Sequence, residues 1–197
     1  MNLIKKNIFI GIVFLLAQFP IAGMADYQDG RDAFDRGDYS AAVKEFETLA
    51  KQNDPKGQYA LAVMYDIGEG VPQNSKEAVK YYRLAAEQGY ADAQNNLGVA
   101  YDQGEGVDTD YKEAMKWYLL AAKGGNKDAP NNIGVFYMIG LGVPRNFEKA
   151  HTWFTIAGAG DSEAIRNKNF VGKKLNSDQL AESKREAEEW RKIWLKR

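Results

Sequence analysis

A tandem repeat of 36 residues restricts the fold more than any other feature of this chain. Residues 57–92 align with residues 93–128 without a gap, and residues 129–164 continue the pattern. The clearest recurring positions are Leu61/Leu97/Ile133, Tyr65/Tyr101/Tyr137, Gly68/Gly104/Gly140, Gly70/Gly106/Gly142, Ala78/Ala114/Ala150, Tyr81/Trp117/Trp153 and Ala85/Ala121/Ala157. A repeat of this length predicts small units that stack on one another.

Each unit has the pattern of two helices. Leu97, Ala100 and Tyr101 have the i, i+3, i+4 spacing of an apolar helical stripe, and Ala114 and Trp117 begin a second one. A Gly-x-Gly-Val segment separates the two stripes and is followed by a residue suited to begin a helix. These expected caps are Asn74, Asp110 and Asn146. One hairpin cannot bury its apolar face alone, so the pattern predicts an all-α solenoid of stacked hairpins.

The flanking segments predict shorter units of the same kind. Residues 26–56 contain a tetratricopeptide-like half-repeat that lacks the Gly-x-Gly-Val segment. Residues 165–197 are expected to form C-terminal capping helices, the last of them from Ser177 to about Leu195. Asn176 and Gln179 have the spacing of a capping box, although Ser177 could equally be the cap. The whole segment after residue 25 is therefore predicted to be one domain.

Residues 1–25 have the three-part pattern of a secretory signal peptide. Lys5 and Lys6 precede an apolar run over residues 8–19, and small residues at Gly23 and Ala25 precede Asp26. Because a membrane-spanning helix needs about 20 apolar residues, a retained anchor is the less favoured alternative. We therefore expect an exported protein, periplasmic or else secreted, that is not embedded in the membrane after cleavage.

The composition excludes several classes of function. The chain has 197 residues, with 26 Lys plus Arg, 27 Asp plus Glu and a formal charge of −1. A nucleic-acid-binding protein needs a basic face, so no nucleic-acid partner is expected. The chain has no cysteine, which rules out disulfides, thiolate metal sites and a cysteine nucleophile.

No pattern of residues predicts catalysis or a cofactor. The Gly-x-Gly segments carry Glu69 and Glu105, where a phosphate loop would need a lysine, so their glycines are expected to provide positive φ angles. The acidic residues between 102 and 110 lack the spacing of a calcium loop. His151, the single histidine, follows the Ala150 position and is expected at the surface or half-buried. We therefore predict no catalytic residue, no metal site and no cofactor.

Two linked motifs resemble a known family. They are Asn96-Leu97-Gly98-x-x-Tyr101-x-x-Gly104-x-Gly106-Val107 and Lys112-x-Ala114-x-x-Trp117-x-x-x-Ala121-Ala122-x-x-Gly125. They are similar to the Sel1-like (Sel-one-like) repeat of the tetratricopeptide-like superfamily. This resemblance implies a right-handed α/α superhelix that binds other proteins as a scaffold or adaptor. A cysteine-rich branch of the family is linked to penicillin binding and β-lactam hydrolysis, and this cysteine-free chain departs from it.

Three functions follow as hypotheses. The first is an exported scaffold that binds a protein or peptide through its concave face. The alternatives are a cell-wall or β-lactam hydrolase and a secreted factor that engages a host or competitor protein. In tetratricopeptide superhelices the first helix of each unit lines the concave face, which gives a set of candidate binding residues. They are Tyr59, Asp92, Asn95, Asn96, Val99, Asp128, Asn131, Asn132 and Val135.

The chemistry of these candidates predicts the type of ligand. An asparagine amide can donate and accept hydrogen bonds at once, which suits the backbone of an extended peptide. Asp92 and Asp128 stand where related co-chaperones place a carboxylate-binding lysine, so neutral or basic ligand segments are expected. The alternative for Asn96 and Asn132 is that they bond to a neighbouring helix and order the stack.

Overall fold

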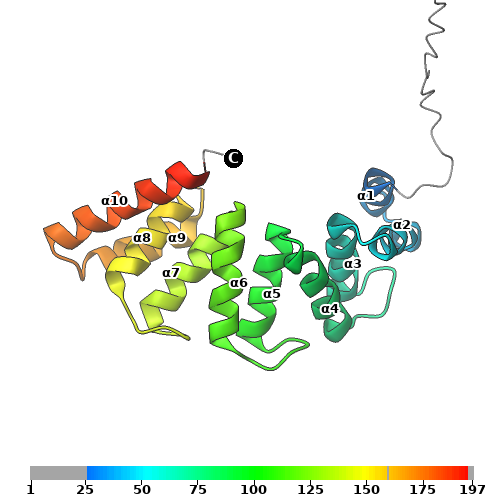
Figure 1. Ribbon diagram of the computed structural model, residues 1–197, viewed down its shortest axis with the longest axis horizontal. Coiled ribbons are helices and arrows are strands. Elements are labelled where there is room, and N and C mark those ends of the chain that lie inside the picture. The colour runs from blue at the N-terminus through cyan, green and yellow to red at the C-terminus, as the bar shows by residue number, and fades with distance from the viewer. Residues whose placement is uncertain (1–25, 159, 195–197) are drawn as a thin grey trace, which may run out of the picture.

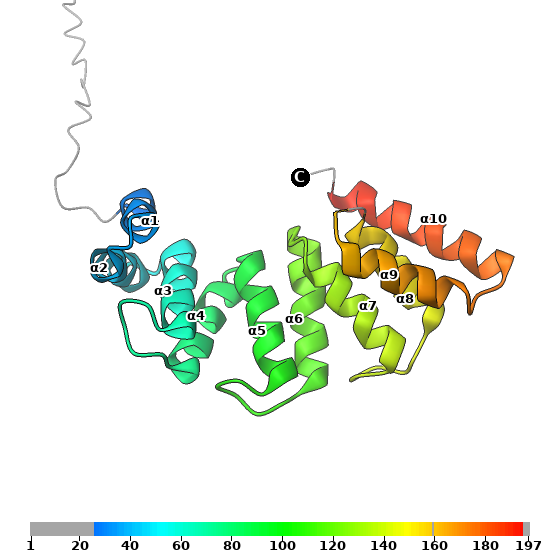
Figure 2. The same cartoon turned by 180° about the vertical axis from the view of Figure 1, so that it is seen from behind.

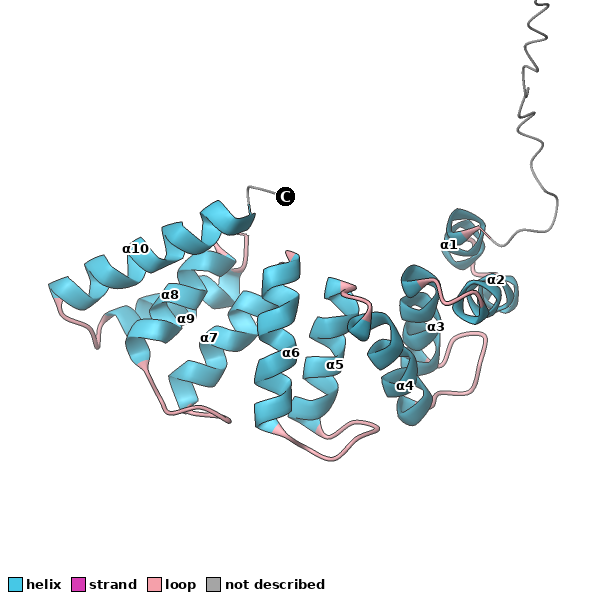
Figure 3. Ribbon diagram, in the orientation of Figure 1, coloured by secondary structure: helices cyan, strands magenta, loops and turns pink. Residues whose placement is uncertain are grey.

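The computed structural model describes residues 26–158 and 160–194, and in these residues α-helix is the regular secondary structure throughout (Figure 3). The helices are α1 (Tyr27–Asp35), α2 (Tyr39–Lys51), α3 (Pro55–Ile67), α4 (Ser75–Glu87), α5 (Ala91–Gln103), α6 (Tyr111–Gly124), α7 (Ala129–Ile139), α8 (Phe147–Ala157), α9 (Ser162–Gly172) and α10 (Ser177–Trp194). The predicted all-α solenoid is confirmed. The predicted signal peptide, residues 1–25, lies outside the described residues.

The helices follow one another along an arc from α1 to α10 (Figure 1). Consecutive helices from α1 to α9 pack against each other, so each hairpin contacts the next. The last helix differs, because α10 packs along α8 (Figure 2). The long loops α3–α4, α5–α6 and α7–α8 lie on the outer edge of the arc (Figure 1).

Side-chain caps fix where the second helix of each unit begins. Asn74 accepts hydrogen bonds from the backbone N–H groups of α4, Asp110 from those of α6 and Asn146 from that of Lys149 in α8. A cap of this kind satisfies N–H groups that have no partner within the helix. The three predicted caps are confirmed. The capping box is also confirmed, because Asn176 and Gln179 each accept a hydrogen bond from the other's backbone N–H.

The two glycines of each Gly-x-Gly-Val segment have different roles. Gly104 ends α5 in the left-handed conformation, as the sequence predicts. Gly106 also has a positive φ of 72°, and a Cβ atom there would lie 2.2 Å from the carbonyl oxygen of Ser75. Gly70 and Gly142 make the same close approach to the start of the second helix in the preceding hairpin. The second glycine is therefore a contact between units, a role that the sequence pattern did not reveal.

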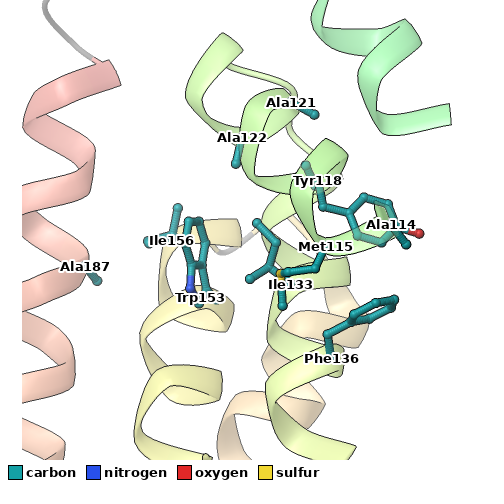
Figure 4. Close-up of a cluster of buried hydrophobic side chains, with 11 residues drawn as sticks. Ala114, Met115, Tyr118, Ala121, Ala122, Ile133, Phe136, Trp153, Ile156 and Ala187 are labelled. Carbon is teal, nitrogen blue, oxygen red and sulfur yellow. The ribbon is translucent and has the colours of Figure 1, made fainter. Parts of the chain in front are cut away.

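The core is a series of clusters, each shared by neighbouring hairpins. In the cluster around α6–α8, Tyr118 and Phe136 meet edge to face with ring centroids 5.4 Å apart. Ala187 of α10 faces Trp153 and Ile156 of α8 and completes this cluster (Figure 4). The final helix thus covers apolar surface that a further repeat would otherwise cover.

Candidate functional site

The predicted binding residues lie in register on α3, α5 and α7, the first helices of the three units. We call this surface, together with the adjoining side of α1, the first-helix face. Asp92 and Asp128 are exposed and Asn95 is buried. The half-buried members are Tyr59, Asn96, Val99, Asn131, Asn132 and Val135.

The asparagines form a chain of amides between neighbouring helices. Asn132 Nδ2 of α7 donates to Asn95 Oδ1 of α5 over 3.1 Å, and Asn95 Nδ2 lies 3.5 Å from Asn96 Oδ1. This contact of Asn132 agrees with the alternative stated above, in which the asparagine bonds to a neighbouring helix and orders the stack. Asn131 Oδ1 is buried without a hydrogen-bond partner among the described residues. Part of this amide chain therefore holds α5 against α7.

Asn96 also lies beside two tyrosines from neighbouring helices. The ring centroids of Tyr59 on α3 and Tyr82 on α4 lie 5.9 Å apart, and the amide of Asn96 lies near both hydroxyls. The Tyr82 hydroxyl donates to Asp66 Oδ2 over 3.0 Å. Burial raises the pKa of both tyrosines, and the nearby Asn96 amide opposes this rise. Both hydroxyls therefore stay protonated at neutral pH.

The two exposed aspartates are connected through a residue that sequence reasoning missed. Asn126 Nδ2 donates to Asp92 Oδ1 over 2.8 Å. Its own Oδ1 accepts from the backbone N–H groups of Asp128 and Ala129 over 3.0 and 2.9 Å. Asn126 thus caps α7, where Asp128 makes no side-chain cap. The equivalent residues are Asp54, Tyr90 and Asp161, and the two aspartates cap α3 and α9 in the same way, so this recurring cap is a signal in the sequence that could have revealed Asn126.

Two hollows open on the first-helix face. The first, of about 200 Å³, lies between α1 and α3 and is lined mainly by apolar side chains, among them Phe34, Tyr59 and Val63. The second, of about 140 Å³, is lined by α3, α4, α5 and the loop after α5, and includes Asn96 and Val99. The structure therefore brings Tyr59, Asn96 and Val99 together. Val135, by contrast, packs towards the cluster around Phe154 and lines neither hollow.

A buried polar pair in the first two units was also missed. The Tyr82 hydroxyl donates to Asp66, and Tyr118 lies beside Asp102 at the equivalent positions. Burial raises the pKa of Asp102, and the neighbouring Tyr118 hydroxyl opposes this rise. In the third unit both positions are apolar, with Met138 and Phe154. The joint change from a polar to an apolar pair is a signal in the sequence that could have revealed the contact.

The prediction for His151 was wrong. Its side chain is buried, 5% exposed, and its Nδ1 lies 2.8 Å from Ser183 Oγ of α10. The position of His151 after Ala150 gave no information that α10 would cover it. Ser183 is 0% exposed and its hydroxyl also donates to Leu180 O, so it does not present a nucleophile to a substrate.

Other types of site have little support within residues 26–158 and 160–194. These residues contain no group of three or more His, Asp or Glu side chains placed to hold a metal ion. None of the helices in the same ranges combines the length and apolar character needed to cross a bilayer. The first-helix face remains the strongest candidate site.

Comparisons with known proteins agree with this architecture. The sequence model of the Sel1 repeat matches residues 55–90, 91–126 and 128–162. A Sel1 repeat protein from Oxalobacter formigenes superposes with a TM-score of 0.63 and 30% identity, over 75% of this chain and 56% of that one. The protective antigen c5321 of uropathogenic Escherichia coli strains is described as having an SLR fold. It superposes with a TM-score of 0.60 and 28% identity, over 86% of this chain and 46% of that one.

The chain thus spans about half the length of these two structures. Among curated proteins, none matches it significantly. Three matched repeats cover more than half of the sequence, and the helices of the structure follow the same units. The protein belongs to the Sel1 repeat family.

Proposed function

We propose that this protein is an exported, non-enzymatic scaffold that binds a partner protein through the first-helix face, as the concave face of a right-handed superhelix. One observation carries the proposal. Tyr59 lines the apolar hollow and packs on Tyr82, which lines the polar hollow beside Asn96, with ring centroids 5.9 Å apart. The hollows are thus neighbours that share a wall, which suits an extended segment with an apolar residue followed by a polar one.

The charges around the hollows favour neutral or basic ligand segments. Asp66 and Glu105 line the polar hollow, whereas Arg31 and Asp35 balance each other at the apolar one. Asp92 adds an exposed carboxylate on α5. Complementary charge would increase the association rate of a basic partner more than its final affinity.

Export is the second part of the proposal and rests on residues 1–25. A basic start, a short apolar run and small residues before Asp26 support cleavage after Ala25. Cell fractionation followed by N-terminal sequencing tests this, and we expect the protein in the periplasm or the medium, beginning at Asp26. Recovery of the intact chain from the membrane fraction would favour the anchor alternative.

The binding test compares substitutions on the two sides of the hairpins. Val63 and Val99 line the two hollows, whereas Leu84 of α4 is 38% exposed and lines neither of them. Wild-type protein purified from the envelope fraction is used to capture partners, alongside Val63→Glu, Val99→Glu and the control Leu84→Glu. We expect the two valine variants to lose a partner that the control retains. Equal retention by all three would contradict the assignment of the face.

A secreted factor that engages a host protein is the second candidate. It is favoured by the similarity to c5321, which is described as a protective antigen of uropathogenic strains. Finding the protein in the culture medium, with capture of a host protein that depends on Val63, would support it. The hydrolase alternative is tested by incubating the same protein with a chromogenic β-lactam, and turnover would contradict the scaffold proposal.

A further inference from the structure

A third, larger hollow lies at the opposite end of the arc from the apolar hollow. It has a volume of about 590 Å³ and is formed by α8, α9 and α10. Four of its lining residues carry nitrogen groups that are or can become cationic: His151, Lys168, Lys173 and Lys184. No carboxylate lines it. We call it the α8–α10 hollow.

Four of the five carboxylates of α10 are engaged elsewhere, and the fifth, Asp178, is exposed and does not line the hollow. Glu182 and Glu189 pair with Arg185, and Glu188 pairs with Arg191. Glu186 accepts a hydrogen bond from Thr152 over 3.1 Å. By contrast, Lys168, Lys173 and Lys184 form no ion pair among the described residues. The positive charge of the hollow is therefore left without a protein counter-ion.

The imidazole of His151 contributes a further group at the wall of the hollow. The Ser183 hydroxyl donates to Leu180 O over 3.0 Å, so at 2.8 Å it accepts from His151 Nδ1–H. The neutral ring therefore has its unprotonated nitrogen at Nε2. Gly172 lies beside this edge of the ring, where a Cβ atom would be 3.6 Å from Nε2, and both residues line the hollow.

The electrostatics of His151 agree with this geometry. Burial lowers the pKa of His151, and the charges of Lys168 of α9 and Lys184 of α10 lower it further. No acidic group opposes them. The ring would accept a proton at Nε2 readily only if an anion entered the hollow.

We propose that the α8–α10 hollow binds a phosphate group, either free or carried by a lipid. Three lysine ammonium groups act as point charges and suit the negatively charged oxygens of a phosphate group. The lining has no arginine, so the lysines would hold the phosphate oxygens as point charges and not through a bidentate fork. Binding couples to protonation of His151 Nε2, which then donates to a phosphate oxygen. This site is separate from the first-helix face and does not depend on it.

His151 is the only histidine in the chain, so its imidazole NMR signal reports on the hollow without ambiguity. The test uses untagged protein, and the signal is followed over a pH titration in inorganic phosphate and in chloride of equal ionic strength. We expect phosphate to raise the titration midpoint of His151 by about 1 pH unit relative to chloride. Identical midpoints in the two salts would overturn the proposal.

Matched lysine variants distinguish phosphate binding in the hollow from a general effect of salt on the charges of the protein. Lys168→Gln/Lys184→Gln is expected to raise the midpoint in chloride, because the repulsion is removed, and to abolish the response to phosphate. The control Lys80→Gln/Lys116→Gln removes two lysines that pair with Glu77 and Glu113 on α4 and α6, and it should change neither value. A response to phosphate that persists in Lys168→Gln/Lys184→Gln would overturn the assignment. Circular dichroism checks that all variants remain helical.

Sedimentation with lipid vesicles distinguishes the two sources of phosphate. Binding to phosphatidylglycerol vesicles but not to phosphatidylcholine vesicles, lost in Lys168→Gln/Lys184→Gln, would support a lipid headgroup. A midpoint shift in inorganic phosphate without sedimentation would support a soluble phosphate compound. Because Val63→Glu leaves the α8–α10 hollow intact, it should retain the phosphate response even if it loses the protein partner.

Discussion

At the scale of single residues, glycine determines how closely the units approach. Gly106 combines a φ of 72° with a position against the backbone that begins α4. Gly125 also has a positive φ, of 90°, but nothing lies within 4 Å of a Cβ atom there. The two positions therefore separate the cost of backbone strain from the cost of steric overlap.

Gly106→Ala should destabilise the protein more than Gly125→Ala. Both place a Cβ in the left-handed region, at a cost of about 1–3 kcal/mol. Only Gly106→Ala also pushes α4 away, which adds about 1–3 kcal/mol of overpacking. Urea denaturation of both variants measures the difference. Equal midpoints would show that the contact between Gly106 and Ser75 does not constrain the stack.

At the scale of elements, α10 shows how a non-repeated helix closes the solenoid. Trp190 packs on Trp153 with ring centroids 4.8 Å apart, and Arg191 donates to Thr155 O over 2.7 Å. His151 and Ser183 add a buried hydrogen bond between the same two helices. Because burial and the charges of Lys168 and Lys184 disfavour a cationic His151, protonation of this histidine costs stability at the interface between α8 and α10.

The docking of α10 should weaken as the pH falls below about 6.5. The pKa of His151 is lowered in the folded protein from 6.5, so the unfolded chain binds more protons below that pH and stability falls. The loss of stability begins near the pKa of His151 in the unfolded chain and is complete below its lowered pKa in the folded protein. Melting temperatures in phosphate-free buffer at pH 8 and pH 5 measure it, since most carboxylates remain ionised in that window.

His151→Gln serves as the control because it can keep a hydrogen bond to Ser183 without titrating in this range. Its melting temperature should fall less between pH 8 and pH 5 than that of the wild type. An equal decrease in both proteins would mean that carboxylates, and not His151, cause the change.

The sequence predicted those elements that repeat or carry a local signal. Caps such as Asn74 and Asp110 are readable because the hydrogen bond links residues two or three positions apart. The contact of Asn126 with Asp92 was not readable, because the two residues are distant in sequence and no local pattern joins them. The burial of His151 depends on where α10 docks, which no repeat period specifies. Local chemistry was therefore predictable, whereas contacts to the non-repeated end were not.

At the scale of the whole molecule, stability is distributed along the arc. The clusters around Phe46, Tyr82 and Tyr118 each draw on adjacent hairpins only. A solenoid of this kind behaves as a row of units coupled to their neighbours. The chain has no cysteine, so packing between neighbours alone must resist unfolding. The ends, where one neighbour is missing, are then the positions that most need a cover.

Removing the last helix should expose the α8 side of the core and promote association. A chain that stops after Leu175 loses the cover over Trp153 and Ile156, which are 5% and 4% exposed in the full structure. We expect soluble oligomers or aggregates in size-exclusion chromatography. Circular dichroism should still show helices, because α10 makes its main contacts with α8 and the earlier helices pack chiefly on one another.

A matched pair of substitutions in the full chain separates the loss of docking from the change in chain length. Ala187 is fully buried, whereas the side chain of Glu188 is 61% exposed. Ala187→Glu should reproduce the association, and Glu188→Ala should remain monomeric if wild type is. A monomeric truncated chain with an unchanged melting temperature would show that α10 is not needed to close the solenoid.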